Sequence, residues 1–286
     1  MQPVIALLTD FGLADGYVGV MKGVMLGIHS QTRFIDVTHA IEPQNVRQAA
    51  FTLLTTYRYF PHGTIFLVVV DPGVGSERRP LVASAGGYLF VAPDNGVLSY
   101  VLDEWDEATF IEPTEERFHL PEVSSTFHGR DIFAPLAANL AANVPLHALG
   151  FVITDPVRLP APLLETSGER IIGEVLHIDH FGNVVTSIGT CRWAEGGGIA
   201  LTPRFNRQPR AVTFDAATAE VQVAGQSLVG VRRTYAEAES GELVAIIGSS
   251  GFLEIAVNRG SAASRLGVNA GDRIEVRLQA WAEAPF

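Results

Sequence analysis

The chain has 286 residues, of which 47% are hydrophobic and 18% are charged, so it has enough apolar material for sizeable cores and is not disordered. A chain of this length usually forms more than one compact core, and we therefore expect two domains. The formal net charge of −11 disfavours a nucleic-acid-binding protein, because such a protein needs a basic surface to neutralise phosphates.

Cysteine content and apolar runs limit the cellular context. Cys191 is the one cysteine, which excludes an internal disulfide and a zinc site built from several cysteines. The amino terminus lacks the basic lead of a signal peptide, and no stretch approaches the roughly 20 apolar residues that span a bilayer. We expect a cytoplasmic protein with no membrane segment.

The first part of the chain alternates between strand and helix patterns. Short apolar runs predict strands, and apolar residues at helical spacing predict helices. The second predicted helix has a clear amphipathic pattern. The expected elements are a strand at Val4–Thr9, a helix from about Gly16 to Ile28, a strand at Phe34–Thr38, a helix at Val46–Tyr57 and a strand at Ile65–Val70. This alternation predicts a mostly parallel sheet flanked by helices.

The pattern changes after Pro80. Gly86-Gly87 separates two short apolar runs, which is a hairpin signal. The elements expected in this part are strands at Leu81–Ala85 and Tyr88–Ala92, a short helix at Val97–Leu102, a strand at Thr109–Ile111 and a helix from about Asp131 to Asn143.

Proline and glycine then indicate a linker, and a different composition follows it. We predict an α/β domain at 1–155, a linker at 156–168 and a smaller carboxyl-terminal β-barrel domain at 169–286. The one expected helix of the second domain is Ser261–Leu266. Its expected strands are Ile171–Ile178, Val184–Ile188, Ile199–Leu201, Ala211–Phe214, Ala219–Val223, Leu243–Ile247, Leu253–Val257 and Arg273–Leu278.

The strand Ile65–Val70 ends on Asp71, which a glycine-rich turn and the guanidinium groups of Arg78 and Arg79 follow. Ligands of open α/β sheets bind beyond the carboxyl ends of the strands, so this segment is a candidate for chemistry. The alternative is a turn with a surface ion pair. A methyltransferase-like or dinucleotide-binding turn is disfavoured, because Pro80 and a hairpin follow where those sites need a helix.

Other polar positions leave alternatives open. Acidic and histidine residues near loop ends would suit a metal-dependent phosphoesterase, but arginines in the same segments oppose a cation. These residues are Asp10, Asp15, Asp71, Asp94, His128 and Asp131. His128, before a predicted helix, has either a functional or a structural role. The segments Asp179–Asn183 and Gly248–Glu254 are either hairpin turns or parts of a ligand site.

Seven short stretches, in this order, resemble the S-adenosyl-L-methionine (SAM) hydrolase family, also called SAM hydroxide adenosyltransferases, which are relatives of the bacterial fluorinase and chlorinase. The stretches are Thr9-Asp10-Phe11-Gly12 with Asp15, His39-x-Ile41-x-Pro43, Asp71-Pro72-Gly73-Val74-Gly75 with Arg78-Arg79, Pro93-Asp94-Asn95-Gly96, Phe127-His128-Gly129-Arg130-Asp131, Asp179-x-Phe181-Gly182-Asn183, and Ser249-x-Gly251 with Leu253-Glu254. They extend through nearly the whole chain.

The resemblance implies attack of water or hydroxide on C5′ of SAM, giving adenosine and L-methionine without a metal or cofactor. It also implies a homotrimer with active sites at the subunit interfaces.

Residue roles follow from the same resemblance. Asp71, Arg78 and His128 match the water-activating triad proposed for the family. The positions that match substrate contacts are Asp10 for the ribose hydroxyls, Asp15, Asp179 and Ser249 for the methionine end, and Asn183 for adenine.

Two alternatives remain beside the hydrolase. In the halogenating relatives an aromatic or small residue replaces the aspartate at position 71 and no histidine stands at 128. A fixed carboxylate at Asp71 would repel a halide ion. The second alternative is a SAM- or adenosine-binding sensor without turnover, which would have no evident use for a positioned Asp, Arg and His. Gln44 stands where the fluorinase has an aromatic residue against the ribose.

Overall fold

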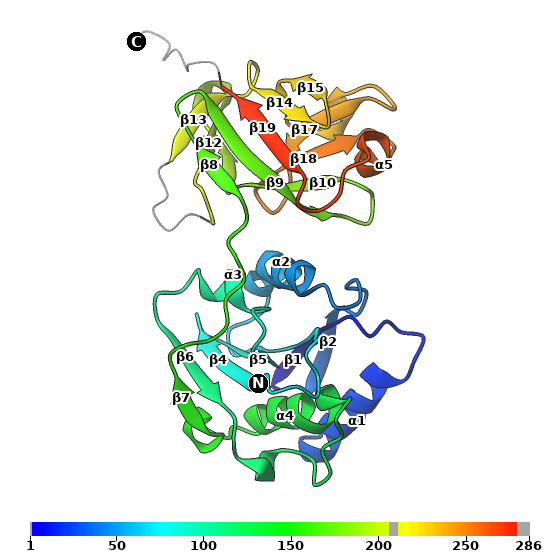
Figure 1. Ribbon diagram of the computed structural model, residues 1–286, viewed down its shortest axis with the longest axis vertical. Helices are drawn as coiled ribbons and strands as arrows, with labels where there is room; N and C mark the ends of the chain where they lie inside the picture. Colours follow the sequence, from blue (N-terminus) through cyan, green and yellow to red (C-terminus); the bar gives the residue numbers. More distant parts are fainter. Residues whose placement is uncertain (1, 206–210, 279–286) are drawn as a thin grey trace. The chain divides into compact units, whose positions relative to one another are not determined.

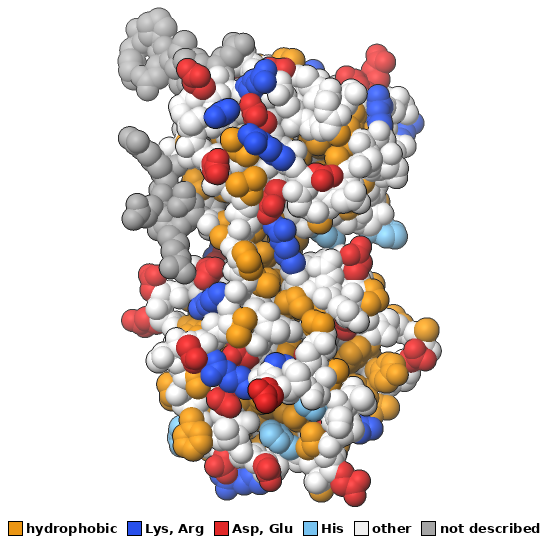
Figure 2. All heavy atoms as spheres, in the orientation of Figure 1, with side chains coloured by type: hydrophobic (Ala, Val, Ile, Leu, Met, Phe, Trp, Pro, Cys, Tyr) orange, Lys and Arg blue, Asp and Glu red, His pale blue; other side chains and the backbone are white. Residues whose placement is uncertain are grey.

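The computed structural model describes residues 2–205 and 211–278, which form two compact units that meet in sequence at Leu159 and Pro160 (Figure 1). No helix among these residues is long and apolar enough to cross a membrane. On the face drawn in Figure 2, Lys and Arg side chains are scattered among acidic ones, as the net negative charge of the sequence leads one to expect.

The first unit contains a seven-stranded sheet with the order β2-β1-β3-β5-β4-β6-β7. The strands are β1 (Val4–Thr9), β2 (Arg33–Thr38), β3 (Ile65–Val69), β4 (Pro80–Ala85), β5 (Tyr88–Pro93), β6 (Ala108–Glu112) and β7 (Phe151–Ile153). Pairs β1–β2, β1–β3 and β3–β5 are parallel, whereas β4–β5, β4–β6 and β6–β7 are antiparallel. The mostly parallel sheet predicted from the sequence is therefore a mixed sheet. The two-residue connection at Gly86-Gly87 forces an antiparallel pair, because a parallel pair needs a crossover.

Helices cover both faces of this sheet. The helices are α1 (Tyr17–Ile28), α2 (Val46–Thr56), α3 (Ser99–Leu102) and α4 (Ala134–Ala141), with one π-helical segment at Gly129–Phe133 and 3₁₀ turns at Tyr57–Tyr59, Glu116–Phe118 and Leu146–Ala148. In Figure 1, α1 and α4 lie on one side of the strands and α2 and α3 on the other. Buried residues of α1, α4, β1 and β3 form the main core of the unit.

The helical spacing of Tyr17, Val20, Met21, Val24 and Ile28 predicts that these residues form the buried face of α1, but the structure buries a different face. Val18, Met21 and Met25 are buried, whereas Tyr17 and Val20 of the predicted face are 47% and 45% exposed. Lys22 is the one charged residue in this helix, so apolar residues occur all around it. Helical periodicity therefore identifies the helix without fixing which side is buried.

The second unit is built on a nine-stranded sheet whose main path is β15-β14-β19-β9-β10-β18-β17-β16, with β8 also paired to β9. The pairs along it are antiparallel except β16–β17. The strands are β8 (Leu164–Thr166), β9 (Arg170–Ile178), β10 (Val184–Gly189), β14 (Glu220–Val223), β15 (Gln226–Val229), β16 (Val231–Arg232), β17 (Leu243–Ile247), β18 (Phe252–Val257) and β19 (Arg273–Arg277). Because β15 also approaches β17, the sheet curls into a barrel-like form.

Smaller elements complete this unit. A three-stranded sheet contains β11 (Cys191–Trp193), β12 (Gly198–Leu201) and β13 (Val212–Asp215). Helix α5 (Ala262–Leu266) begins after Ser261, whose hydroxyl accepts a hydrogen bond from the Ser264 amide. There are 3₁₀ turns at Glu195–Gly197 and Tyr235–Glu237. Strand β8 lies inside the segment expected to be a linker, where three residues give too short a pattern for the sequence to show it.

Candidate active site

A buried ion pair lies just beyond the carboxyl end of β3. The Nε atom of Arg78 lies 3.0 Å from each carboxylate oxygen of Asp71, and its Nη2 atom also donates to Oδ2. The side chains of Arg78 and Asp71 are only 9% and 6% exposed. The guanidinium also lies 5.0 Å from the centre of the Phe133 ring. The positive charge of Arg78 thus compensates the charge of a carboxylate that is buried away from water, and the hydrogen bonds from Arg78 fix the orientation of the Asp71 side chain.

Arg78 also contacts His128. Its Nη2 atom lies 2.8 Å from Nδ1 of His128. A guanidinium can only donate, so Nδ1 is the acceptor and the proton of the neutral imidazole is on Nε2. Burial, and after it the charge of Arg78, lower the pKa of His128 below its ordinary value. The structure therefore brings Asp71, Arg78 and His128 together, with Arg78 as the bridge.

The neighbouring Arg79 has a different role. Its Nε atom donates to Asp94 over 2.7 Å, and its Nη2 atom donates to the carbonyl oxygen of Asp155 over 2.8 Å. The other carboxylate oxygen of Asp94 accepts from the amide of Val157 at 2.8 Å. Arg79 and Asp94 therefore fasten the segment that ends the first unit, and Arg78 alone of the two arginines pairs with Asp71.

A second carboxylate–guanidinium pair lies beside His128. Asp131 is fully buried, and its carboxylate accepts from Nε of Arg130 at 2.5 Å and from the amide and hydroxyl of Ser124 at 2.9 and 2.8 Å. These bonds lower the pKa of Asp131 although burial opposes them. Among the residues described, no three His, Cys, Asp or Glu side chains gather as a group that could hold a metal.

Asp10 and Asp15 lie on the loop between β1 and α1. Strands β1 and β3 are parallel neighbours, so Asp10 and Asp71 follow the same edge of the sheet. The Oδ2 atom of Asp10 accepts from the amide of Gln44 at 2.8 Å. Asp15 is exposed, and within residues 2–205 and 211–278 it has no counterpart of the Gln44 bond that fixes Asp10. The sequence did not single out Thr9 and His39 as a pair, but Thr9 Oγ1 lies 2.8 Å from His39 Nδ1 immediately before Asp10.

In the second unit, Asp179 and Asn183 close the loop between β9 and β10. Oδ1 of Asp179 accepts from the amides of Phe181 and Asn183 at 2.9 and 2.8 Å, and Oδ2 accepts from the Asn183 side-chain amide at 2.8 Å. Phe181 is 75% exposed at the tip of this loop. Ser249 is exposed in the turn between β17 and β18. Asp179 and Asn183 therefore occupy a hydrogen-bonded turn, and Ser249 occupies an exposed one.

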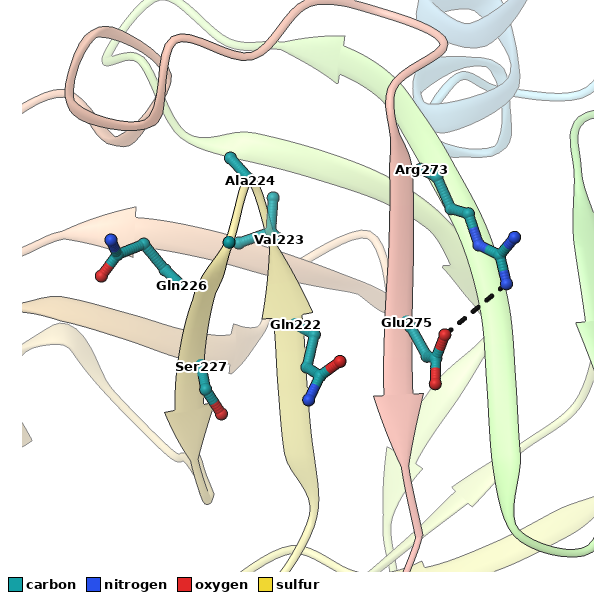
Figure 3. A pocket seen from close by; sticks show the side chains of 8 residues that line it. Gln222, Val223, Ala224, Gln226, Ser227, Arg273 and Glu275 are labelled. Carbon is teal, nitrogen blue, oxygen red and sulfur yellow. Dashed lines mark ion pairs between the residues drawn. The ribbon is translucent and has the colours of Figure 1, made fainter.

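A hollow on the barrel-like sheet contains none of the predicted site residues. It lies over β14, β15 and β19 and is lined by side chains such as Gln222, Ser227 and Glu275 (Figure 3). Arg273 and Glu275 form an ion pair of 3.5 Å there. The paired charges and the shallow hairpin surface offer no reactive group, and the Asp71 cluster remains the candidate site.

Sequence comparison covers both units. The profile of the SAM hydroxide adenosyltransferase N-terminal domain matches residues 5–150, and that of the C-terminal domain of the same family matches residues 173–275. The chain belongs to the SAM hydroxide adenosyltransferase family. The family predicted from the seven short stretches is confirmed, as is the two-domain organisation.

Relatives with curated names support this assignment. The chain is 41% identical to the (R)-S-adenosyl-L-methionine hydrolase of Thermus thermophilus, over 97% of this chain and all of the relative. It is 39% identical to the hydrolase of that name from Salinispora tropica, over 96% and 97% of the two chains. The fluorinase of Actinopolyspora mzabensis is more distant, at 30% identity over 96% and 97%.

A solved structure shows the same fold. The uncharacterized conserved protein from Thermotoga maritima superposes with a TM-score of 0.83 at 38% sequence identity. The match covers 95% of this chain and 99% of that protein.

Proposed function

We propose that this family member hydrolyses SAM by attack of water on C5′ of the ribose, giving adenosine and L-methionine. The observation that carries the proposal is the buried Asp71–Arg78–His128 cluster at the end of β3. The names of the relatives that are 38–41% identical over nearly the whole chain agree with it.

The chemistry needs a positioned nucleophile more than an acid. The sulfonium of SAM leaves as a neutral thioether, so no group has to protonate the sulfur. Water is a weak nucleophile at neutral pH and must be aligned opposite the C–S bond. In the reaction, the water oxygen bonds to C5′, the C–S bond breaks, and its electron pair remains on the sulfur of methionine.

Arg78 divides the roles of Asp71 and His128. Because Nδ1 of His128 accepts from Arg78, the ring proton is on Nε2. The His128 ring also hydrogen-bonds to the Ser124 backbone, and in the proposal the Nε2–H turns to the water oxygen when substrate is bound. The ionised carboxylate of Asp71 still has free lone pairs beside its bonds to Arg78, and it takes the proton that water loses as the C–O bond forms. Asp71 is thus the proton acceptor and His128 the orienting donor in this proposal.

The remaining residues bind substrate in the proposal. Asp10 holds the ribose hydroxyls, Asp15, Asp179 and Ser249 lie at the methionine end, and Asn183 contacts adenine. We extend the proposal to a cytoplasmic homotrimer with active sites at subunit interfaces and without a metal or cofactor, as the family resemblance implies. The halogenase alternative is disfavoured by the fixed negative charge of Asp71, which would repel a halide ion.

Product analysis tests the proposal. Purified protein is incubated with SAM in H₂¹⁸O, in chloride-free and chloride-rich buffers, and the nucleoside is identified by chromatography and mass spectrometry. We expect adenosine with ¹⁸O at its 5′ position in both buffers, and loss of product in Asp71→Asn. The matched control is Asp103→Asn, which removes a carboxylate from an exposed ion pair with Arg158.

Two other outcomes would contradict the hydrolase, and a third would contradict the role of Asp71. A 5′-halo-adenosine formed with chloride would assign a halogenase, and SAM binding without turnover would assign a sensor. Full activity in Asp71→Asn would remove Asp71 from the reaction.

A further inference from the structure

Glu254 is a buried carboxyl group in an apolar part of the second unit. On β18, the neighbours Leu253 and Ile255 point into the barrel core, so Glu254 points to the other face of the sheet. Its cross-strand neighbours are Val185 on β10 and Ile246 on β17, both apolar and buried. Only 8% of the residue is exposed.

The Glu254 side chain lies in a space that a glycine leaves open. A Cβ atom at Gly248 would stand 1.7 Å from Oε1 of Glu254, so any larger residue there would displace the carboxyl group. Gly248 begins the turn that carries Ser249. Within the described chain, the side chain of Glu254 has no hydrogen bond or ion pair. A buried carboxyl group without a partner is costly, which points to a partner that arrives from outside the chain.

Two titratable groups face Glu254. Asp179 on the β9–β10 loop and Tyr235 on the 3₁₀ turn both interact with it electrostatically. Burial, and after it the charge of Asp179, raise the pKa of Glu254 to about 7. Tyr235 is itself kept neutral, because burial and the two carboxyl groups raise its pKa. The net result is a mostly buried acid, next to a second carboxylate, that ionises readily once a cation is present.

We propose that Glu254 is the second carboxyl group of the subsite that receives the α-ammonium group of the substrate, beside Asp179. This inference rests on the proposed function. An ammonium group has three N–H donors, whereas both oxygens of Asp179 are already used within its own loop. Glu254 supplies the free acceptors, and the ligand's charge replaces the proton that Glu254 carries in the empty site.

The test measures binding of S-adenosyl-L-homocysteine, which carries the α-ammonium group but, as a neutral thioether, is not cleaved. If the ionised form of Glu254 binds this ligand, affinity rises about tenfold between roughly pH 6 and pH 8, because the competent fraction rises by that factor. Calorimetry should show this rise in the wild type and a flat profile in Glu254→Gln. The same thioether without its α-amino group should give flat profiles in both proteins, which controls for other titrating groups.

Two variants keep the test decisive. Gly248→Ala pushes the carboxyl group away and should also flatten the profile, in case Glu254→Gln does not fold. Glu165→Gln, on the exposed side of β8, should behave like the wild type.

An unchanged pH profile in both Glu254→Gln and Gly248→Ala, in a wild type that does hydrolyse SAM, would overturn this inference alone. An effect of Glu254→Gln on SAM but not on the thioether would assign Glu254 to the sulfonium and likewise overturn it. A wild type that does not act on SAM would refute the proposed function instead.

Discussion

Replacing Asp71 by asparagine leaves the guanidinium of Arg78 buried without a compensating charge. The Arg78 side chain is 9% exposed, and its remaining contacts are the hydrogen bond to Nδ1 of His128 and the Phe133 ring, neither of which carries a compensating charge. Removing one partner of a buried pair costs about 3–5 kcal/mol, and we take about 3 kcal/mol because asparagine still accepts one hydrogen bond. For a unit of this size, that free energy lowers the melting temperature by about 6–12 °C.

Thermal unfolding followed by circular dichroism measures this loss against two controls. Asp103→Asn breaks an exposed pair and should cost at most about 1 kcal/mol. The double variant Asp71→Asn/Arg78→Met removes both buried charges and should recover most of the stability, while hydrolysis remains absent. If Asp71→Asn melts like Asp103→Asn, the Asp71–Arg78 pair is solvated and the reasoning is wrong.

Three further predictions concern the two units. Because burial and the charge of Arg78 lower the pKa of His128, the activity of the wild type should fall on acidification only below the ordinary histidine pKa of about 6.5. Arg78→Met removes one of these two causes and should move the acid limb of the kcat/KM profile to higher pH. An unmoved acid limb would contradict the contact between Arg78 and His128. Gly75→Ala should lower the free energy of unfolding in urea by at least about 1 kcal/mol more than Gly63→Ala. Both glycines have positive φ, but only a Cβ atom at position 75 would meet the Ser125 carbonyl oxygen, at 2.4 Å. Equal losses in the two variants would contradict this close approach. Asp179→Ala removes three hydrogen bonds of the β9–β10 loop and should destabilise the protein by about 1–3 kcal/mol, with faster amide hydrogen exchange confined to that loop as the distinguishing result.

The sequence predicts strands well where local signals are strong. Ile65–Val70 was expected and β3 spans Ile65–Val69, and the hairpin at Gly86-Gly87 forms as the two glycines indicate. The prediction of the buried face of α1 was wrong, because apolar residues occur on all sides of this helix. Short strands such as β7 and β8 lack enough residues for a period to appear.

The candidate site shows a comparable limit. Arg78 and Arg79 are adjacent, and nothing in their spacing from Asp71 distinguishes them. The path of the turn after β3 directs Arg78 to Asp71 and His128, and Arg79 to Asp94. Directions of this kind depend on backbone angles within a loop, and periodicity carries no information about them. The residues of the Asp71 cluster could therefore be predicted from the sequence, but the hydrogen bonds and ion pairs among them could not.

The surroundings of His128 explain why its neutral form suits the proposed reaction. Asp71 and Asp131 would each raise its pKa, but each carboxylate is paired with its own arginine, Arg78 or Arg130. A protonated His128 would present an N–H at Nδ1 to the guanidinium of Arg78, which cannot accept it. Two compensated ion pairs therefore keep a neutral donor beside an ionised acceptor at one sheet edge. Water can use both groups at once, whereas a halide ion could use only the donor and would meet the repulsion of Asp71.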